Sequence, residues 1–242
     1  MDRATTSLAR KLTQFIELSP DELGCLDRLQ AHTRTFGRRA NLRSEGEGGQ
    51  HCFILQDGWA CCFKLLQNGR RQIINFAVPG DFLGLRSVLF RVSDHSVASI
   101  TSVRVSSFSG RDLFDIINQF PRVAVAILWA LSCEEAIVVE HLVNLGRRNA
   151  LERVAHFLIE FGERLKVVGL ASDHGYECPF TQDDLADALG LSAIHINRIL
   201  RQLRERQLLT LSHGSLEIHD LPGLAAIAQF SDQYLDQDHR PS

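Results

Sequence analysis

The stretch FTQDDLADALGLSAIHINRILRQLRER, residues 180–206, decides the fold of this chain. It predicts two short helices joined by a tight turn. Thr181 stands at an N-cap position, and Asp184, three residues later, completes a capping box at the start of the first helix. Gly190 supplies the turn, and Ser192 stands at the N-cap position of the second helix.

The second predicted helix has one apolar and one basic face. Four aliphatic residues have the i, i+3, i+4, i+7 spacing of a buried stripe, namely Ile196, Ile199, Leu200 and Leu203. Between Leu191 and Arg206 there are four arginines and one acidic residue, so the exposed face is positively charged. This layout is typical of a helix-turn-helix, whose second helix enters the major groove of DNA. An ordinary helical hairpin with a solvated charged face is the alternative.

Two apolar segments follow the basic helix, QLLTL (207–211) and SLEIHD (215–220), around His213-Gly214. A β-hairpin directly after a recognition helix is a wing, so the region is predicted to be a winged helix-turn-helix. We expect a last helix over residues 221–235, followed by a polar, frayed tail.

DNA contacts are expected from the basic helix and its surroundings. Arg198 is expected to read a guanine edge or an adjacent phosphate, and Arg201 to bind a phosphate, with further base or backbone contacts from Asn197 and His195. An exposed Ile194 can pack on a thymine methyl group. Other phosphate contacts are expected at the two helix N-termini and the wing tip, from Thr181, Gln182, Ser192 and His213. For the two capping residues, helix capping alone is an equal alternative.

The N-terminal half is predicted to begin with helices and to continue with β-strands. Residues 6–34 have helical spacing, and Ser19-Pro20 starts a second helix with proline at its first position. From about Thr35 to Ser109 short apolar runs alternate with Gly, Asn and Asp. Asp57-Gly58 and Asn68-Gly69 are hairpin signals, so this region predicts a small β-barrel or jelly roll, with a short helix over 83–90.

Residues 121–145 are the longest helical candidate, and apolar residues cover more than one of its faces. A helix that is apolar on two sides needs two partners, which we expect to be its own barrel and the same helix of a second chain. A helix buried within one chain is the alternative. Gly146–Asn149 marks a boundary, and a further helix follows it.

Composition limits the possible functions. The chain has 242 residues, a net charge of −3 and 45% hydrophobic residues, so binding to DNA must come from a local patch. The six cysteines show no C-x-x-C spacing, which argues against a zinc or iron–sulfur framework. The N-terminus lacks a signal-peptide core, and the longest apolar run is far below the ~20 residues that span a bilayer. We therefore expect a cytoplasmic protein without a membrane partner.

The order of elements is helices, a β-roll, a long helix, and a helix-turn-helix with a wing. It resembles that of the cyclic-AMP receptor/fumarate-nitrate regulator (CRP/FNR) family of bacterial transcription regulators. The motifs that carry this resemblance are NGRRQIINFAVPGDFLGL (68–85), FTQDDLADALGLSAIHINRILRQLRERQLL (180–209) and LSHGSLEIHD (211–220). The resemblance covers nearly the whole chain.

The resemblance implies an α+β fold in three parts. Residues 1–120 would form a sensor domain, a double-stranded β-helix (jelly roll) of the cyclic-nucleotide-binding type with N-terminal helices. Residues 121–146 would form a dimerisation helix and hinge, with the dimer contact in 121–145, and residues 147–242 the winged helix-turn-helix domain. The implied function is a homodimeric regulator, an activator rather than a repressor, that binds double-stranded DNA at a palindromic operator and contacts RNA polymerase. No enzymatic activity, catalytic residue or metal site is implied.

The sensing residues depart from the family pattern. In members that bind cyclic nucleotides, a Gly-Glu pair holds the ribose and an Arg-Ser pair the phosphate. This chain has Gly84-Leu85 at the first place and Asp94-His95-Ser96 at the second, so the carboxylate and the guanidinium are both missing. Cyclic AMP would lose a charge-assisted contact and is not the expected effector. An effector pocket, if one exists, is expected at Gly84, Leu85, Arg86, Ser87, His95 and Ser96.

No cofactor is predicted. Oxygen-sensing family members hold an iron–sulfur cluster with three closely spaced N-terminal cysteines, whereas here only Cys25 precedes residue 50. Haem through His51, Cys52 or His95, or another small-molecule effector, stays open as an alternative.

A thiol switch is a further possibility. If Asp57-Gly58 forms a two-residue hairpin, Cys52 and Cys61 project from the same face of neighbouring strands. Cys178, just before the DNA-binding helices, is the third redox candidate. Small apolar side chains that fill the roll are the favoured alternative for these cysteines.

Three other functions compete with a signal-gated regulator. A regulator of the same fold that needs no ligand is the first. A cupin-like metal enzyme on the β-roll would need a His-x-His and carboxylate cluster, which His51 and His95 alone do not supply. A module that acts on a protein partner is disfavoured by the basic helix and the wing.

Overall fold

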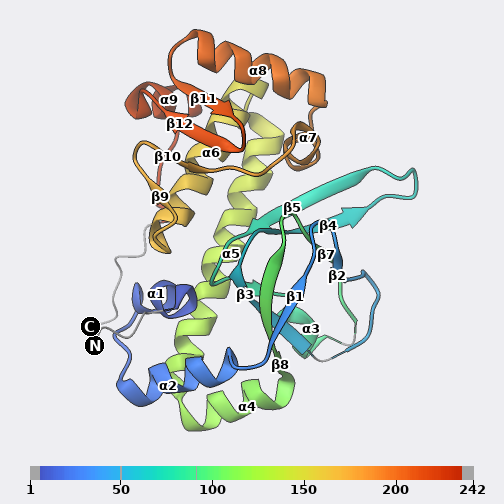
Figure 1. Ribbon diagram of the computed structural model, residues 1–242, viewed down its shortest axis with the longest axis vertical. Coiled ribbons are helices and arrows are strands. Elements are labelled where there is room, and N and C mark those ends of the chain that lie inside the picture. Colours follow the sequence, from blue (N-terminus) through green and yellow to red (C-terminus); the bar gives the residue numbers. More distant parts are fainter. Residues whose placement is uncertain (1–5, 50, 91, 236–242) are drawn as a thin grey trace. The chain divides into compact units, whose positions relative to one another are not determined.

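The computed structural model describes residues 6–49, 51–90 and 92–235, which divide into two compact units (Figure 1). The first unit contains the described residues up to Gly69 and Ile74–Ser132. The second contains Arg70–Ile73 and the described residues from Cys133 onward. The division therefore falls inside the long helix α5, Pro121–Arg147, and not at either of its ends.

Two helices begin the first unit, α1 (Ser7–Thr13) and α2 (Pro20–Leu29). Ser19 caps α2, and Glu22 completes a capping box, with proline at the first helical position as expected. The helical region ends sooner than the sequence suggests, because strand β1 already begins at Thr33.

The β-roll consists of two four-stranded sheets, which confirms the predicted jelly roll. One sheet has the order β1-β8-β3-β6, with the strands Thr33–Phe36, Val103–Ser109, His51–Asp57 and Phe82–Leu83. The other has the order β2-β7-β4-β5, with the strands Asn41–Arg43, Ser96–Ser99, Ala60–Leu65 and Arg71–Ala77. Aliphatic and aromatic side chains of both sheets form one buried core, which includes Phe53, Leu55, Leu83, Val97 and Val105.

The expected hairpin at Asp57-Gly58 is wrong, because β3 and β4 belong to different sheets. Gly58 forms a corner at which the chain passes from one sheet to the other. Its φ is +80°, and a Cβ there would lie 2.2 Å from the carbonyl oxygen of Ser102, so only glycine fits. Trp59 fixes the corner, since its carbonyl accepts a hydrogen bond from the Ile100 amide at 2.7 Å. By contrast, β4 and β5 are neighbours around Asn68-Gly69, which confirms the second hairpin.

Helices cover the roll within the first unit. The short helix α3 (Arg86–Leu89) lies within the expected segment 83–90. Helix α4 (Gly110–Gln119) was not predicted from the sequence, although Ser109 and Asp112 form a capping box at its start. Figure 1 shows α1, α2 and α4 beside the first half of α5, and their apolar residues share one core with it, including Leu8, Leu12, Leu26, Leu113 and Ile127.

The second unit contains the remainder of α5, helix α6 (Ala150–Val167) and a winged helix-turn-helix, as predicted. The helix pair is α7 (Gln182–Leu189) and α8 (Ala193–Glu205), and the wing is β11 (Leu209–Ser212) with β12 (Ser215–Ile218). The wing belongs to a four-stranded sheet of order β11-β12-β10-β9, in which β10 is Gly175–Glu177 and β9 is Ala171–Ser172.

The last helix is shorter than expected. Helix α9 spans Leu221–Ala228 and ends where Gln229 adopts a left-handed conformation with φ +48°. The expected frayed tail lies outside the described residues from position 236 onward. In the described part of the chain, no helix combines the length and the hydropathy needed to cross a membrane.

Candidate nucleic-acid interface

Local hydrogen bonds define the two helices of the interface as the sequence predicted. The Thr181 hydroxyl accepts from the Asp184 amide at 3.1 Å, and the Asp184 carboxylate accepts from the Thr181 amide at 3.0 Å. Ser192 caps α8 by accepting from the His195 amide at 3.2 Å. Gly190 ends α7 in the left-handed conformation, with φ +64°, and thereby makes the turn.

One face of α8 is buried and fixes the helix against the unit. Ile196, Ile199 and Leu203 are almost inaccessible to solvent, and so are Leu185 and Leu189 of α7. Leu200, the fourth member of the predicted stripe, is only partly buried. This packing leaves the opposite face of α8 free to contact a ligand.

The exposed face of α8 carries the predicted DNA-reading residues. Ile194 is 85% exposed, and Asn197, Arg198 and Arg201 are exposed as well. The Arg198 guanidinium lies 2.8 Å from Nε2 of His195. A guanidinium can only donate, so the ring of His195 accepts this hydrogen bond and orients Arg198.

Arg201 differs from Arg198 in its partner. Its Nε donates to Glu205 Oε1 at 2.8 Å, one helical turn further along. This is an exposed (i, i+4) ion pair, which contributes little stability and can be exchanged for a phosphate.

The remaining predicted contacts lie where the sequence placed them. Thr181, Gln182 and Ser192 are exposed at the two helix N-termini. His213 is exposed at the tip of the wing, where it adopts a positive φ of 51° beside Gly214. The structure therefore brings all of the predicted DNA contacts to the surface of α7, α8 and the wing.

Arg153 of α6 holds the first of these helices, a role that the sequence did not indicate. Its guanidinium donates to the carbonyl of Leu189 at the end of α7 (2.7 Å), and to those of Leu145 (2.9 Å) and Arg148 (3.1 Å) at the end of α5. A cation among C-terminal carbonyls is a favourable cap for both helices. Nothing in the local spacing distinguishes Arg153 from other arginines.

A buried polar cluster lies behind the interface, between α5 and α6. Glu160 is fully buried, and both of its carboxylate oxygens lie within 3.0 Å of Nε2 of His141. Burial alone would raise the pKa of Glu160, but the charge and hydrogen bond of His141, together with Arg164, outweigh it and hold that pKa below its ordinary value.

His156 is fully buried beside the same cluster, and its ring packs on Phe230 and Tyr234. Burial, with the nearby charge of Arg148, lowers the pKa of His156 to about 4. Its ring nitrogens form no hydrogen bond with any described residue, although Nε2 is 3.3 Å from Glu140 Oε1. His156 is therefore neutral near pH 7.

The six residues of the expected effector pocket lie in the β-roll in two groups. The first group is Gly84, Leu85, Arg86 and Ser87. Arg43 (β2), which the sequence reading did not select, is 6% exposed and fills the space beside Gly84 and Ser87. Its guanidinium donates to the Ser87 hydroxyl and to the carbonyl of His51, and lies 5.6 Å from the ring centroid of Phe53.

The second group is His95 and Ser96. His95 is buried, and its Nδ1 is 2.7 Å from Asp94 Oδ1. Asp94 also pairs with the exposed Arg86 at 3.2 Å. The Ser96 hydroxyl accepts from the Glu45 amide at 2.9 Å. These side chains thus have partners within the roll.

The three redox candidates are poorly placed for thiol chemistry. Cys52 and Cys61 are fully buried and lie in different sheets, so the expected pairing on neighbouring strands is wrong. Cys178 is also buried, and burial raises its pKa to about 12. Reactive cysteines are exposed and have a lowered pKa. Among the described residues, no group of three or more His, Cys, Asp or Glu side chains could hold a metal ion.

Comparison with known proteins agrees with this architecture. A model of the Crp-like helix-turn-helix domain matches residues 152–227, and a model of the cyclic nucleotide-binding domain matches residues 33–120. The transcriptional activatory protein AadR of Rhodopseudomonas palustris is 32% identical over 213 residues, which are 88% of this chain and 87% of AadR. The nitrogen fixation regulation protein FixK of Bradyrhizobium diazoefficiens is 35% identical over 193 residues, 80% of each chain. The solved structure of FixK2 from Bradyrhizobium japonicum superposes with a TM-score of 0.74 at 26% identity, over 82% of this chain and 98% of FixK2.

Proposed function

The chain belongs to the CRP/FNR family of bacterial transcription regulators, and we propose that it binds a two-fold-symmetric operator as a homodimer and activates transcription in response to a signal other than cyclic AMP. In the three-part organisation that we propose, residues 1–120 form the sensor, 121–146 the dimerisation helix and hinge, and 147–242 the DNA-binding domain. By family likeness the protein acts in the cytoplasm and contacts RNA polymerase.

The exposed face of α8 is the observation that carries this proposal. Arg198, oriented by His195, is proposed to read a guanine edge, and Arg201 to exchange Glu205 for a phosphate. Ile194 is proposed to contact a thymine methyl group, since an apolar side chain that is 85% exposed can gain by packing there. Asn197 is proposed to add a base or backbone contact.

Phosphate contacts are proposed for the surrounding positions. The N-termini of α7 and α8 present backbone amides, and the Thr181, Gln182 and Ser192 side chains lie exposed beside them. His213 is proposed to reach a phosphate from the tip of the wing. Thr181 and Ser192 also serve as caps, so their phosphate contacts would add to a structural role.

The exposed apolar face of α5 supports a homodimer through residues 121–145. Six exposed aliphatic side chains lie along this helix, namely Val125, Leu128, Val138, Val139, Leu142 and Val143. Leu142 is 70% exposed, which is costly for a leucine unless a partner covers it. The same helix of a second chain would bury these side chains, as a pair of helices does in a coiled coil.

Arg43 supports a signal other than cyclic AMP. Its guanidinium occupies the space beside Gly84 and Ser87, where an effector was expected, and Leu85 supplies no carboxylate for a ribose. A regulator of the same fold without a ligand is the second candidate. Control by thiols finds less support, because the three cysteines are buried.

Selection of DNA fragments from a random-sequence pool, followed by fluorescence anisotropy, tests the proposed function. We expect a palindromic site with half-sites one helical turn apart, bound by a dimer in sedimentation. Affinity should fall steeply from about 50 to 200 mM salt, as phosphate contacts require. Selection of no common sequence, or weak binding that is equal for all DNA, would contradict the proposal.

A further inference from the structure

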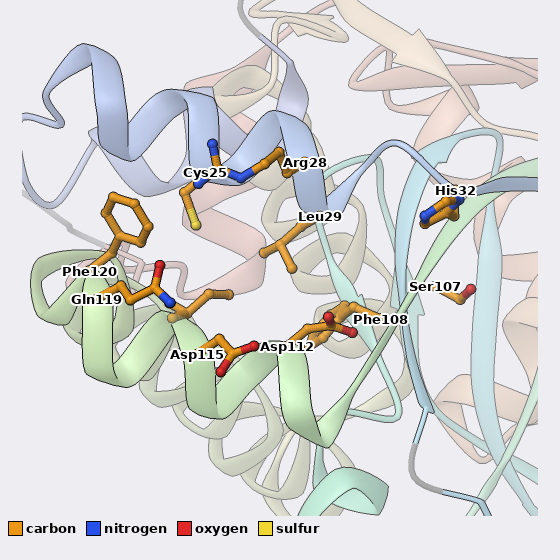
Figure 2. A pocket seen from close by; sticks show the side chains of 11 residues that line it. Cys25, Arg28, Leu29, His32, Ser107, Phe108, Asp112, Asp115, Gln119 and Phe120 are labelled. Carbon is orange, nitrogen blue, oxygen red and sulfur yellow. The ribbon is translucent and has the colours of Figure 1, made fainter.

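A cavity of about 290 Å³ opens in the first unit, between α2, β8 and α4 (Figure 2). None of its lining residues belongs to the six expected effector positions in the roll. Figure 2 shows Cys25, Arg28 and Leu29 on the α2 side and Asp115 and Gln119 on the facing α4 side. The cavity therefore lies apart from the expected effector positions, in the unit that contains the β-roll.

Both polar and apolar side chains line the cavity, and its apolar part is well buried. Cys25, Leu29, Phe108 and Ile116 line it, and each is at most 8% exposed. Burial raises the pKa of the Cys25 thiol, so this residue contributes to the lining as a small apolar side chain. A ligand that fills this space gains by covering apolar surface.

Opposite charges stand on the two walls of the cavity. Arg28 projects from α2, with its guanidinium 5.7 Å from the ring centroid of Phe120, and Asp115 projects from α4. Within the described part of the chain, neither forms an ion pair. Asp112, also in the lining, is already engaged, since its carboxylate accepts from the Ser109 amide at 2.6 Å and from the Ser109 hydroxyl at 2.7 Å.

We propose that this cavity binds a small zwitterion of the apolar amino-acid class. Its carboxylate would bind the Arg28 guanidinium and the Gln119 amide, its ammonium group would bind Asp115, and its apolar side chain would cover Leu29 and Ile116. Two opposite charges on the two walls of one partly apolar cavity are both satisfied by one molecule that carries both complementary charges.

The cavity is also connected to the long helix. Phe120 lines it and directly precedes Pro121, the first residue of α5. An occupant would contact Phe120 and could thereby shift the start of α5. This regulatory step rests on the proposed function, whereas binding of the zwitterion does not.

Calorimetric titration of the full-length protein without DNA tests the site, with L-leucine as the probe. Two analogues each lack one charge, 4-methylpentanoate the ammonium group and 3-methylbutylamine the carboxylate. We expect L-leucine to bind and each analogue to bind about tenfold more weakly, because each loses one charged hydrogen bond. Absence of L-leucine binding to the wild-type protein would overturn the proposal.

Two exposed positions provide the variants. Asp115→Asn should weaken L-leucine binding about tenfold and abolish discrimination against 4-methylpentanoate. Arg28→Gln should also weaken L-leucine binding about tenfold, and it should abolish discrimination against 3-methylbutylamine. Asp27→Asn on α2 and Arg111→Gln on α4 change the same charges outside the cavity and should leave binding unchanged. Unchanged binding in Asp115→Asn and Arg28→Gln, or an equal loss in the controls, would refute the site.

A separate measurement of operator affinity with and without L-leucine tests the connection to α5. A change in affinity that Asp115→Asn removes would support it. Binding of L-leucine in the calorimeter without any change in operator affinity would leave the site in place and refute its regulatory role. Failure to bind any operator would refute the proposed function, while the calorimetric result would still decide the site.

Discussion

His141 of α5 neutralises Glu160 of α6, which is fully buried, with Nε2 of the imidazole 2.9 Å from Oε2 and 3.0 Å from Oε1 of the carboxylate. Arg164 is 3.7 Å from the same carboxylate, and the Tyr234 hydroxyl is 3.5 Å away. This pair connects the second half of α5 to the core of the DNA-binding unit. Its loss would leave a negative charge buried without its closest partner.

We expect His141→Leu to lower the free energy of unfolding by about 3 kcal/mol, because removal of one partner of a buried pair leaves the other uncompensated. Urea denaturation followed by circular dichroism measures this change. The double variant His141→Leu/Glu160→Leu should recover most of the loss, since it buries no charge. A single variant as stable as the wild-type protein would show that Arg164 alone suffices to neutralise Glu160.

His156 should make stability fall with decreasing pH. Its pKa is about 6.5 in the unfolded chain and is lowered to about 4 by burial in the folded protein. Between these values the unfolded state takes up a proton that the folded state does not, so acidification favours unfolding. Between these two pH values, His156 lowers the free energy of unfolding by about 3 kcal/mol.

Urea denaturation at several pH values between 7 and 4 measures the effect of His156. His156→Phe keeps an aromatic ring against Phe230 and Tyr234. In this variant the free energy of unfolding should decrease by about 3 kcal/mol less between pH 7 and 4 than in the wild-type protein. His174→Asn, at an exposed position of the same unit, should retain the wild-type slope. Glu160 contributes separately at lower pH, because its lowered pKa means that its stabilisation is lost only below about 4.5.

Arg198→Ala and Arg201→Ala should differ in their effect on DNA binding. The first is expected to cost about 1–3 kcal/mol and to relax one base position, because a base-edge contact is lost. The second should weaken binding to all DNA sequences alike and reduce the salt dependence of the affinity, because a phosphate contact is lost. Anisotropy titrations on the selected operator and its single-base variants measure both. Arg204→Ala, on the same helix, is the matched control; an equal, small loss in all three variants would speak against the assignment.

Leu142→Asp should convert the protein to a monomer and reduce operator affinity, because a carboxylate would replace a side chain that is 70% exposed in the single chain and is proposed to be buried in the dimer. Sedimentation velocity measures the change. Phe114→Asp alters a 58% exposed apolar residue of α4 and should leave the dimer intact. A wild-type protein that sediments as a monomer would contradict the proposed dimer itself.

Cys52, Cys61 and Cys178 should not react with a thiol reagent such as Ellman's reagent in the folded protein. The three thiols are at most 1% exposed, and the pKa of Cys178 is raised to about 12, so little thiolate is available. All should react once urea unfolds the chain. Rapid modification of the native protein at any of these positions, mapped by mass spectrometry, would revive the thiol-switch hypothesis.

The sequence best predicted the features that depend only on residues close together in the chain. The Thr181–Asp184 capping box and the turn at Gly190 are closed by hydrogen bonds and backbone angles inside one helical turn, so their signals survive in any tertiary setting. The apolar stripe of α8 and the wing follow from periodicity in the same way. For this reason the helix-turn-helix, its exposed basic face and its family could all be predicted from the sequence.

Tertiary structure alone decided which distant residues meet. Asp57-Gly58 has the signal of a hairpin, yet the close approach of Ser102 makes it a corner between two sheets. Glu160 lies 19 residues from His141, and Arg43 lies 44 residues from Ser87, so neither contact leaves a local pattern. These contacts depend on how helices and sheets pack, because a buried charge takes whichever partner the packing brings within reach. The sequence by itself therefore determined the helix-turn-helix and its exposed basic face, whereas the packing determined its supports and the interior of the β-roll.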